Sequence, residues 1–277
     1  RESPISRTAI AKRLNVSLPT VMRIVDELVK EGFVRPEGST EWSGGRRRPL
    51  LEFNADGFVV IGVDLGATKF YGALSDLGGN ILDEIDMGRH RTTSEGNYKR
   101  LIELLDTLLA SPKLAGRKVR GIGVGVPGIT LHEDGIVKWA YSLNWRDFPL
   151  KARLTGYYGL PITVDNDVNL AAMGELWFGA GQNVQNMILI VSGKGIGAGT
   201  VIDGALYRGG SEASGEIGNF IPGREFLGKN FQDFGALESV ASGTGILKRA
   251  RASLKSSRDP GMLNSMTEED VLTAARQ

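Results

Sequence analysis

Carboxylates and amides stand beside glycine turns in the second half of the chain. The stretch L-P-I-T-V-D-N-D-V-N (160–169) is typical of a strand that runs into a helix, and an Asn-Asp pair lies at the junction. This point is the carboxyl end of a strand, where α/β sheets place ligand-binding groups. G-E-I-G-N (215–219) and G-A-L-E (235–238) also put a carboxylate next to a glycine. Carboxylates accept hydrogen bonds and side-chain amides both donate and accept them, which suits the hydroxyls of a sugar. The predicted sugar-binding residues are Asn166, Asp167, Glu216, Asn219 and Glu238. For Asp167 alone, the alternative is a helix N-cap.

Two glycine-rich hairpins suit the binding of phosphate. The stretches V-V-I-G-V-D-L-G-A-T-K-F-Y-G-A-L-S-D (59–76) and M-I-L-I-V-S-G-K-G-I-G-A-G-T-V-I-D (187–203) both read as strand, turn, strand. Gly66, Gly72 and Asp76 of the first recur 127 positions later in the second. Backbone N–H groups at such tips form anion-binding nests, and a carboxylate there can hold a metal through water. The alternative for each turn alone is a plain tight turn. The predicted phosphate set is Asp64, Gly66, Thr68, Lys69, Gly193, Gly195 and Gly197.

The first 52 residues predict a separate helical head. Ser6 and Ser17 are expected to cap two short helices that a break at 15–17 separates. Pro19 fits the first turn of the second helix, where its missing N–H is harmless, and Gly32 follows the end. The apolar faces are expected to be Ala9, Ile10 and Leu14 in the first helix and Val21, Ile24, Val25 and Leu28 in the second.

A basic hairpin is expected after the two helices. F-V-R-P and P-L-L-E-F-N read as short strands around the tip E-G-S-T-E-W-S-G-G-R-R-R, so the head has the order of a winged helix-turn-helix. Residues near the start of a recognition helix face base edges, and wing arginines reach phosphates or the minor groove. The alternative is a helical adaptor whose arginines serve solubility. The predicted DNA-binding residues are Ser17, Thr20, Arg23, Arg46, Arg47 and Arg48.

Composition limits the class of protein. The 277 residues are 41% hydrophobic and 23% charged, as in globular proteins, and 38 glycines imply many tight turns. Residues 1–48 hold ten Lys or Arg against six Asp or Glu, so the polyanion-binding region is expected in the head. Without cysteine the chain has no disulfide, and a cytoplasmic location is expected. No apolar run has the length of a membrane span.

The motifs together resemble the ROK family of repressors and sugar kinases, within the actin-like ATPase superfamily. They are the winged head, D-L-G-A-T, V-P-G, D-N-D-V-N-L-A-A-M-G-E, S-G-K-G-I-G-A-G and G-E-I-G. The resemblance implies an α/β fold with two lobes around a sugar-binding cleft, and Mg-ATP between the hairpins in kinase members. It implies that Asp167 is the base in kinases, and that Asn166, Glu216 and Glu238 bind the sugar. The expected domains are 1–52 (winged helix-turn-helix), 53–180 (first lobe) and 181–277 (second lobe, incomplete).

The chain departs from the family pattern at the zinc site that the resemblance implies. Asn219 stands where the family has a histidine, and the zinc-cysteine motif aligns with Lys229, Phe231 and Ala236. Zinc needs His, thiolate or carboxylate ligands, so no structural zinc is expected, and apolar packing of Phe231 and Ala236 is expected instead. A last helix is expected over 267–276, and the sequence is expected to start and end within a longer family pattern.

The sequence is compatible with two functions. The first is a sugar-responsive transcriptional regulator, a repressor that binds operator DNA through the head and a monosaccharide in the cleft, as a homodimer or a dimer of dimers. The second is an ATP-dependent sugar kinase with Asp167 as the base. The head favours the first, whereas the two intact glycine turns support the second. Zinc is not expected, and Mg-ATP belongs to the second function.

Overall fold

The computed structural model describes residues 3–41, 48–66, 69–88, 92–231 and 235–254. The chain divides into two compact units. The first comprises residues 1–62, 72–85 and 105–122, and the second comprises 63–71, 86–104 and 123–277. No helix among the described residues is long and apolar enough to cross a membrane.

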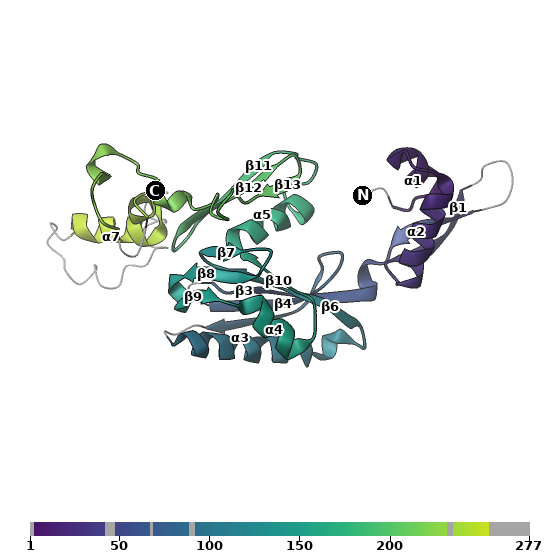
Figure 1. Ribbon diagram of the computed structural model, residues 1–277, viewed down its shortest axis with the longest axis horizontal. Coiled ribbons are helices and arrows are strands. Elements are labelled where there is room, and N and C mark those ends of the chain that lie inside the picture. Colours follow the sequence, from purple (N-terminus) through teal and green to yellow (C-terminus); the bar gives the residue numbers. More distant parts are fainter. Residues whose placement is uncertain (1–2, 42–47, 67–68, 89–91, 232–234, 255–277) are drawn as a thin grey trace. The chain divides into compact units, whose positions relative to one another are not determined.

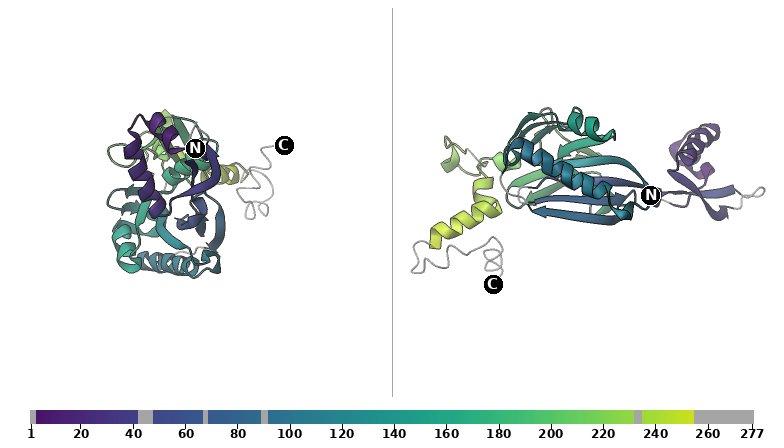
Figure 2. Two further views of the ribbon diagram at one scale, coloured as in Figure 1. Left: turned by 90° about the vertical axis from the view of Figure 1, so that its right-hand side faces the viewer. Right: turned by 90° about the horizontal axis from the view of Figure 1, so that it is seen from below.

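The two helices of the head form as the sequence predicts. Helix α1 (Arg7–Leu14) is capped by the Ser6 hydroxyl, which accepts from the Ala9 N–H, and it ends at Asn15 in the left-handed conformation. Helix α2 (Leu18–Lys30) is capped by Ser17, with proline in its first turn, and Gly32 follows at φ +84°. The helices lie beside the following hairpin in both views of Figure 2.

The core of the head differs in part from the expected apolar faces. Its buried residues are Ala11, Val21, Val25 and Leu51. Ile24 and Leu14 are 43% and 65% exposed and Ala9 is exposed, so their predicted places in the core were wrong. The core of the head is small, because α1 contributes only one buried residue to it. Leu51 of the second strand completes this core, where further residues of the two helices were expected.

The hairpin after α2 is antiparallel and longer than expected. Strand β1 (Val34–Glu41) pairs with β2 (Arg48–Phe53), from Val34 opposite Phe53 to Glu41 opposite Arg48. Ile5 exchanges two backbone hydrogen bonds of 2.9 Å with Leu51, which ties the start of the chain to β2. At the base of the hairpin, the Arg120 guanidinium lies over the Phe33 and Phe58 rings, 4.6 and 4.8 Å from their centroids.

A five-stranded sheet follows in the order β10-β6-β3-β4-β5. Its consecutive hairpins form the expected strand, turn, strand pattern, and Asp76 fixes the second turn by accepting from the N–H groups of Gly78 and Asn80. Helix α3 buries leucines at 101, 104, 105 and 108, the spacing of one helical face. These elements are β3 (Phe58–Asp64), β4 (Lys69–Asp76), β5 (Ile81–Gly88), α3 (Ser94–Leu109), β6 (Lys118–Val126) and β10 (Ile162–Asn166).

The rest of the second unit includes two small antiparallel sheets and several helices. One sheet has the order β7-β8-β9 and the other β11-β12-β13. Figure 1 shows α5 along the second of these sheets, which it contacts through all three strands. The elements are β7 (Ile129–Leu131), β8 (Ile136–Ala140), β9 (Trp145–Phe148), α4 (Leu150–Tyr158), α5 (Asp167–Phe178), β11 (Met187–Ser192), β12 (Ile196–Ile202), β13 (Ala205–Tyr207), α6 (Glu238–Ala241) and α7 (Gly243–Leu254). The helix expected over 267–276 lies outside the described residues.

Two glycines explain how close α5 comes to β12. A Cβ at Gly199 would lie 2.5 Å from the Ala172 Cβ and 2.8 Å from the Val168 carbonyl oxygen. A Cβ at Gly197 would lie 2.9 Å from the Val168 Cγ2. The glycines of the second hairpin that follow its tip therefore serve the packing of helix on strand.

Candidate functional site

The junction between β10 and α5 forms where the sequence predicts it. Asn166 ends the strand and is the N-cap of α5: its Oδ1 accepts from the N–H groups of Val168 (2.9 Å) and Asn169 (3.1 Å). Its Nδ2 donates to the Gly128 carbonyl oxygen at 3.0 Å. The cap is therefore Asn166 and not Asp167, and the Asn166 side chain keeps only one amide hydrogen for a ligand.

Three chain segments converge on Asp167. The Leu65 N–H, just after β3, donates to the Gly125 carbonyl oxygen of β6 at 2.9 Å. A Cβ at Gly125 would lie 3.3 Å from the Asp167 Cα, a tight contact, so β6 passes close to the start of α5 at this glycine. Asp64, the last residue of β3, is thereby brought within electrostatic reach of Asp167.

Three buried carboxylates of this region have raised pKa values. Burial, and then the charge of Asp64, raise the pKa of Asp167 from 3.8 to about 6, although the Val168 N–H opposes the shift. Burial, and then the charges of Asp167 and Glu238, raise the pKa of Glu216. Burial also raises the pKa of Asp64, against the effect of Lys69. A carboxyl with a pKa near 6 is suited to accept a proton from a hydroxyl at neutral pH.

Glu238 joins the predicted sugar set to the tip of the second hairpin. Its Oε2 accepts from the Ile196 N–H at 2.9 Å, and a Cβ at Gly195 would lie 3.0 Å from that oxygen. The Gly193 carbonyl oxygen accepts from the Gly243 N–H at 2.8 Å, at the start of α7. The tip is thus held by both α6 and α7, and one oxygen of Glu238 is already occupied.

The predicted phosphate set is divided by the structure. Gly193 has open space where a Cβ would lie, Gly195 faces Glu238, and Gly197 packs on α5. The binding of phosphate by these glycines stays a prediction. Gly66 lies close to the backbone of Lys69: a Cβ added to Gly66 would lie 3.0 Å from the Lys69 carbonyl oxygen. The Lys69 Nζ pairs with the Asp86 carboxylate at 2.5 Å. Thr68 lies outside the described residues.

Aromatic packing is found in the segment where the family pattern places cysteines. The rings of Phe226 and Phe231 stack with centroids 6.1 Å apart, and the Lys229 Nζ lies 5.4 Å from the Phe226 centroid. Ala236 is 3% exposed. Asn219 is exposed, and its Nδ2 donates to the Glu216 carbonyl oxygen at 3.4 Å. Within the described ranges, no group of three or more His, Asp or Glu is arranged to hold a metal.

The predicted DNA-reading residues of α2 share an exposed end of the helix. The Ser17 and Thr20 hydroxyls lie 2.7 Å apart, and the Arg23 side chain is 68% exposed, with a surface ion pair to Glu27. Such a pair is weak, so the guanidinium can exchange it for a base or a phosphate. Arg46 and Arg47 lie outside the described residues, and of Arg48 only the backbone, at the start of β2, is described.

The sequence reasoning missed a buried ion pair beside the site. Asp165, one residue before the predicted Asn-Asp pair, is 1% exposed and accepts from Arg208 at 2.7 and 3.1 Å. His132 Nδ1 lies 3.1 Å from the same carboxylate oxygen. A charged residue in the apolar strand I-T-V-D-N was the available signal, because a buried carboxylate needs a partner.

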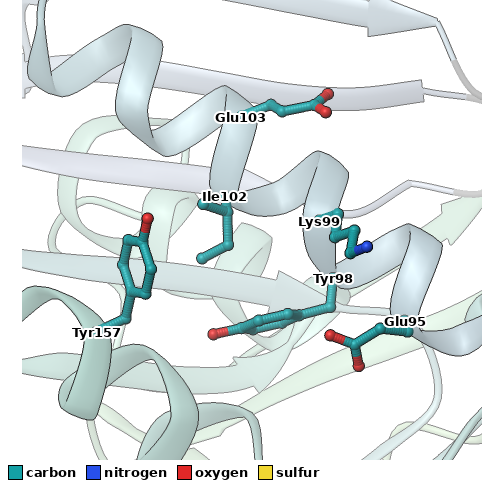
Figure 3. A pocket seen from close by; sticks show the side chains of 6 residues that line it. All are labelled: Glu95, Tyr98, Lys99, Ile102, Glu103 and Tyr157. Atoms are coloured by element: carbon teal, nitrogen blue, oxygen red, sulfur yellow. The ribbon is translucent and has the colours of Figure 1, made fainter.

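A surface hollow of about 330 Å³ lies between α3 and α4, away from these residues. Figure 3 shows Tyr157 of α4 opposite Tyr98 and Ile102 of α3. Two carboxylates, Glu95 and Glu103, line the hollow, and Glu95 is bound by both Nη atoms of Arg153, at 2.8 and 2.9 Å. The hollow contains none of the predicted site residues, so we assign the candidate site to the carboxylates around Asp167.

Both the head and the body of the chain match known protein families. The model described as ROK family matches residues 60–277, and the model described as winged helix-turn-helix DNA-binding matches residues 1–35. A putative xylose repressor of Caldicellulosiruptor sp. (strain Rt8B.4) is 34% identical over 96% of this chain and 67% of its own length. A glucokinase of Halalkalibacterium halodurans is 34% identical over 77% of this chain and 66% of its own length.

A solved structure of a ROK family transcriptional regulator, a homologue of the E. coli MLC protein, superposes with a TM-score of 0.85. It is 26% identical and covers 99% of this chain and 70% of its own. The chain spans between 57% and 67% of the length of three xylose repressors that it matches. With a family model over most of the chain and a repressor relative over nearly all of it, the chain belongs to the ROK family.

Proposed function

We propose that this protein is a sugar-responsive transcriptional repressor that binds operator DNA through its head and a monosaccharide at the carboxylates around Asp167. The observation that carries the proposal is the union of a DNA-binding head with a ROK body in one chain, as in the repressor relatives. The names of those relatives make xylose the first effector to test. We further propose a homodimer, because two heads read a two-fold operator, and a cytoplasmic location.

The site's electrostatics support a polyhydroxyl ligand. Asp167 and Glu216 have raised pKa values partly because neighbouring carboxylates repel one another. Sugar hydroxyls donate hydrogen bonds to carboxylates, so a bound monosaccharide relieves part of this repulsion. A sugar that binds one arrangement of the lobes more tightly than another shifts the population towards that arrangement. The operator affinity then changes with the population.

The test is an electrophoretic shift with the DNA upstream of the protein's own operon. A salt-sensitive, sequence-specific band that xylose or another monosaccharide weakens supports the proposal. Shifts of equal strength on operator and on scrambled DNA would exclude a repressor.

Arg23→Ala is expected to weaken operator binding about tenfold or more, since a base or phosphate contact of arginine contributes roughly 1–3 kcal/mol. Lys30→Ala, at the opposite end of α2, is the matched control and is expected to change the affinity by less than about threefold. Fluorescence anisotropy on labelled operator measures both variants. Equal losses for the two variants would contradict a reading role for the start of α2.

The second candidate function is an ATP-dependent sugar kinase, favoured by the Asp167 carboxyl with its pKa of about 6 and by the glucokinase relatives. Mg-ATP would lie at Asp64 and the Gly193 tip, and Asp167 would accept the proton of the attacking hydroxyl. A coupled ADP-release assay over hexoses and pentoses decides the matter. Turnover that Asp167→Asn reduces by about 10²-fold or more would establish the enzyme, in line with the usual contribution of a general base.

A further inference from the structure

The buried Asp165 carboxylate connects several segments of the second unit. Its Oδ1 accepts from the Asn166 N–H at 2.7 Å and from the Asn169 Nδ2 at 3.1 Å, so it braces the first turn of α5. Its Oδ2 accepts from the Arg208 Nε at 3.1 Å and Nη2 at 2.7 Å. His132, just after β7, approaches the same oxygen at 3.1 Å. Since Asp165 is 1% exposed, these partners take the place of water around its carboxylate.

Arg208 stands at the root of the loop that carries Glu216. It follows β13 directly, and its carbonyl oxygen accepts from the Ser214 N–H at 3.1 Å. The Ser214 hydroxyl donates to the Tyr207 carbonyl oxygen at 2.7 Å. The loop then returns to β12, where the Gly215 carbonyl oxygen accepts from the Ala198 N–H at 2.8 Å. Glu216 is therefore one residue beyond a segment that Arg208 anchors at its base.

The ion pair thus spans two parts of the candidate site. On one side Asp165 precedes Asn166 and Asp167 in sequence and holds the N–H of the first. On the other side Arg208 carries the loop of Glu216, whose pKa the Asp167 charge raises. A guanidinium that gives two N–H groups to one carboxylate oxygen fixes direction as well as distance, which a lysine does not.

We propose that Asp165 and Arg208 are positioning residues that set the distance between Glu216 and Asp167, and thereby the affinity for the monosaccharide. The proposal deepens the proposed function and rests on it, because it assigns a new pair to the same sugar site. Neither side chain contacts the sugar. Their effect passes through the start of α5 and the loop over 209–216.

The test compares Arg208→Lys with a matched control in the full chain. Arg208→Lys keeps the positive charge and removes the guanidinium that gives two N–H groups to one carboxylate. Arg153→Lys makes the same change in the Arg153–Glu95 pair, away from the site. Xylose affinity by calorimetry is expected to fall about tenfold or more for Arg208→Lys, because small misplacements of binding groups are costly. Arg153→Lys is expected to keep the wild-type sugar affinity. Both variants are expected to keep operator affinity without sugar.

A double-mutant cycle and hydrogen exchange complete the test. The double variant carries both Asp165→Asn and Arg208→Lys. Its fold-loss of xylose affinity is expected to be smaller than the product of the fold-losses of the two single variants, as for residues that act as one unit. Backbone amides over 213–216 are expected to exchange faster in Arg208→Lys alone. Sugar affinity within about twofold of wild type, or independent losses in the cycle, would overturn the proposal. If the wild-type protein binds no monosaccharide, the proposed function fails, and unchanged exchange over 213–216 then separately rejects the positioning role.

Discussion

Replacing Asp167 by Asn is expected to stabilise the folded chain above about pH 7 by roughly 2–3 kcal/mol, while leaving its stability near about pH 3 unchanged. The reason is the raised pKa of Asp167, from 3.8 to about 6, caused by burial and by Asp64. Well below the ordinary pKa the carboxyl is protonated in both the folded and the unfolded chain. As the pH rises towards neutrality the unfolded chain ionises first, so the wild-type protein loses stability that an uncharged side chain retains.

Urea unfolding from about pH 3 to about pH 8 measures this difference. The free energy of unfolding of Asp167→Asn minus that of the wild type is expected to grow through roughly pH 4–7 and then to level off. Asp134→Asn, an exposed position outside the site, is the control for the loss of one carboxylate. A gain for Asp167→Asn that is the same at both ends of this pH range would show that the charge of Asp167 is not the cause.

Replacing Gly128 by Ala is expected to destabilise the chain by roughly 2–4 kcal/mol, because backbone strain and overpacking add. Gly128 has φ +92°, and an added Cβ would lie 2.2 Å from the Trp139 carbonyl oxygen. That oxygen belongs to the backbone, so a rotamer change cannot relieve the contact. The turn must shift, and with it the Gly128 carbonyl that accepts from Asn166. Sugar affinity is therefore expected to fall as well.

Gly159 provides the matched control for this substitution. It ends α4 with φ +64°, and no atom lies within 4 Å of the Cβ position. Gly159→Ala carries the backbone strain without the clash and is expected to cost about 1 kcal/mol. Urea midpoints with unchanged slopes measure both variants. Losses of equal size would mean that the contact with Trp139 has no influence.

The fold was predictable wherever a local signal coincided with the final packing. Serine caps, the proline in α2 and the glycine after it located both helices of the head correctly. The apolar stripe was less informative, since Ile24 fits the period of the helix and is nevertheless exposed. Which apolar residues become buried depends on Leu51, a strand residue beyond both helices, and helical periodicity carries no information about that partner.

The site was predictable as a set of residues and not as a network. The carboxyl end of β10 could be expected to hold Asn166 and Asp167, but not the division of labour by which Asn166 caps α5. The glycines of the second hairpin looked alike in sequence, whereas Gly195 faces Glu238 and Gly197 packs on Val168. Asp165 and Arg208 are 43 residues apart in sequence, so their pairing becomes visible only in three dimensions.

The close packing of α5 on β12 predicts how these positions are free to evolve. The nearest neighbour of Gly197 is the Val168 side chain, so an alanine at 197 is compatible with a smaller residue at 168, and the two positions should covary among relatives. Gly199 meets the Val168 carbonyl oxygen, which no substitution removes. Position 199 should therefore remain glycine among relatives, because any other residue there would require α5 itself to move.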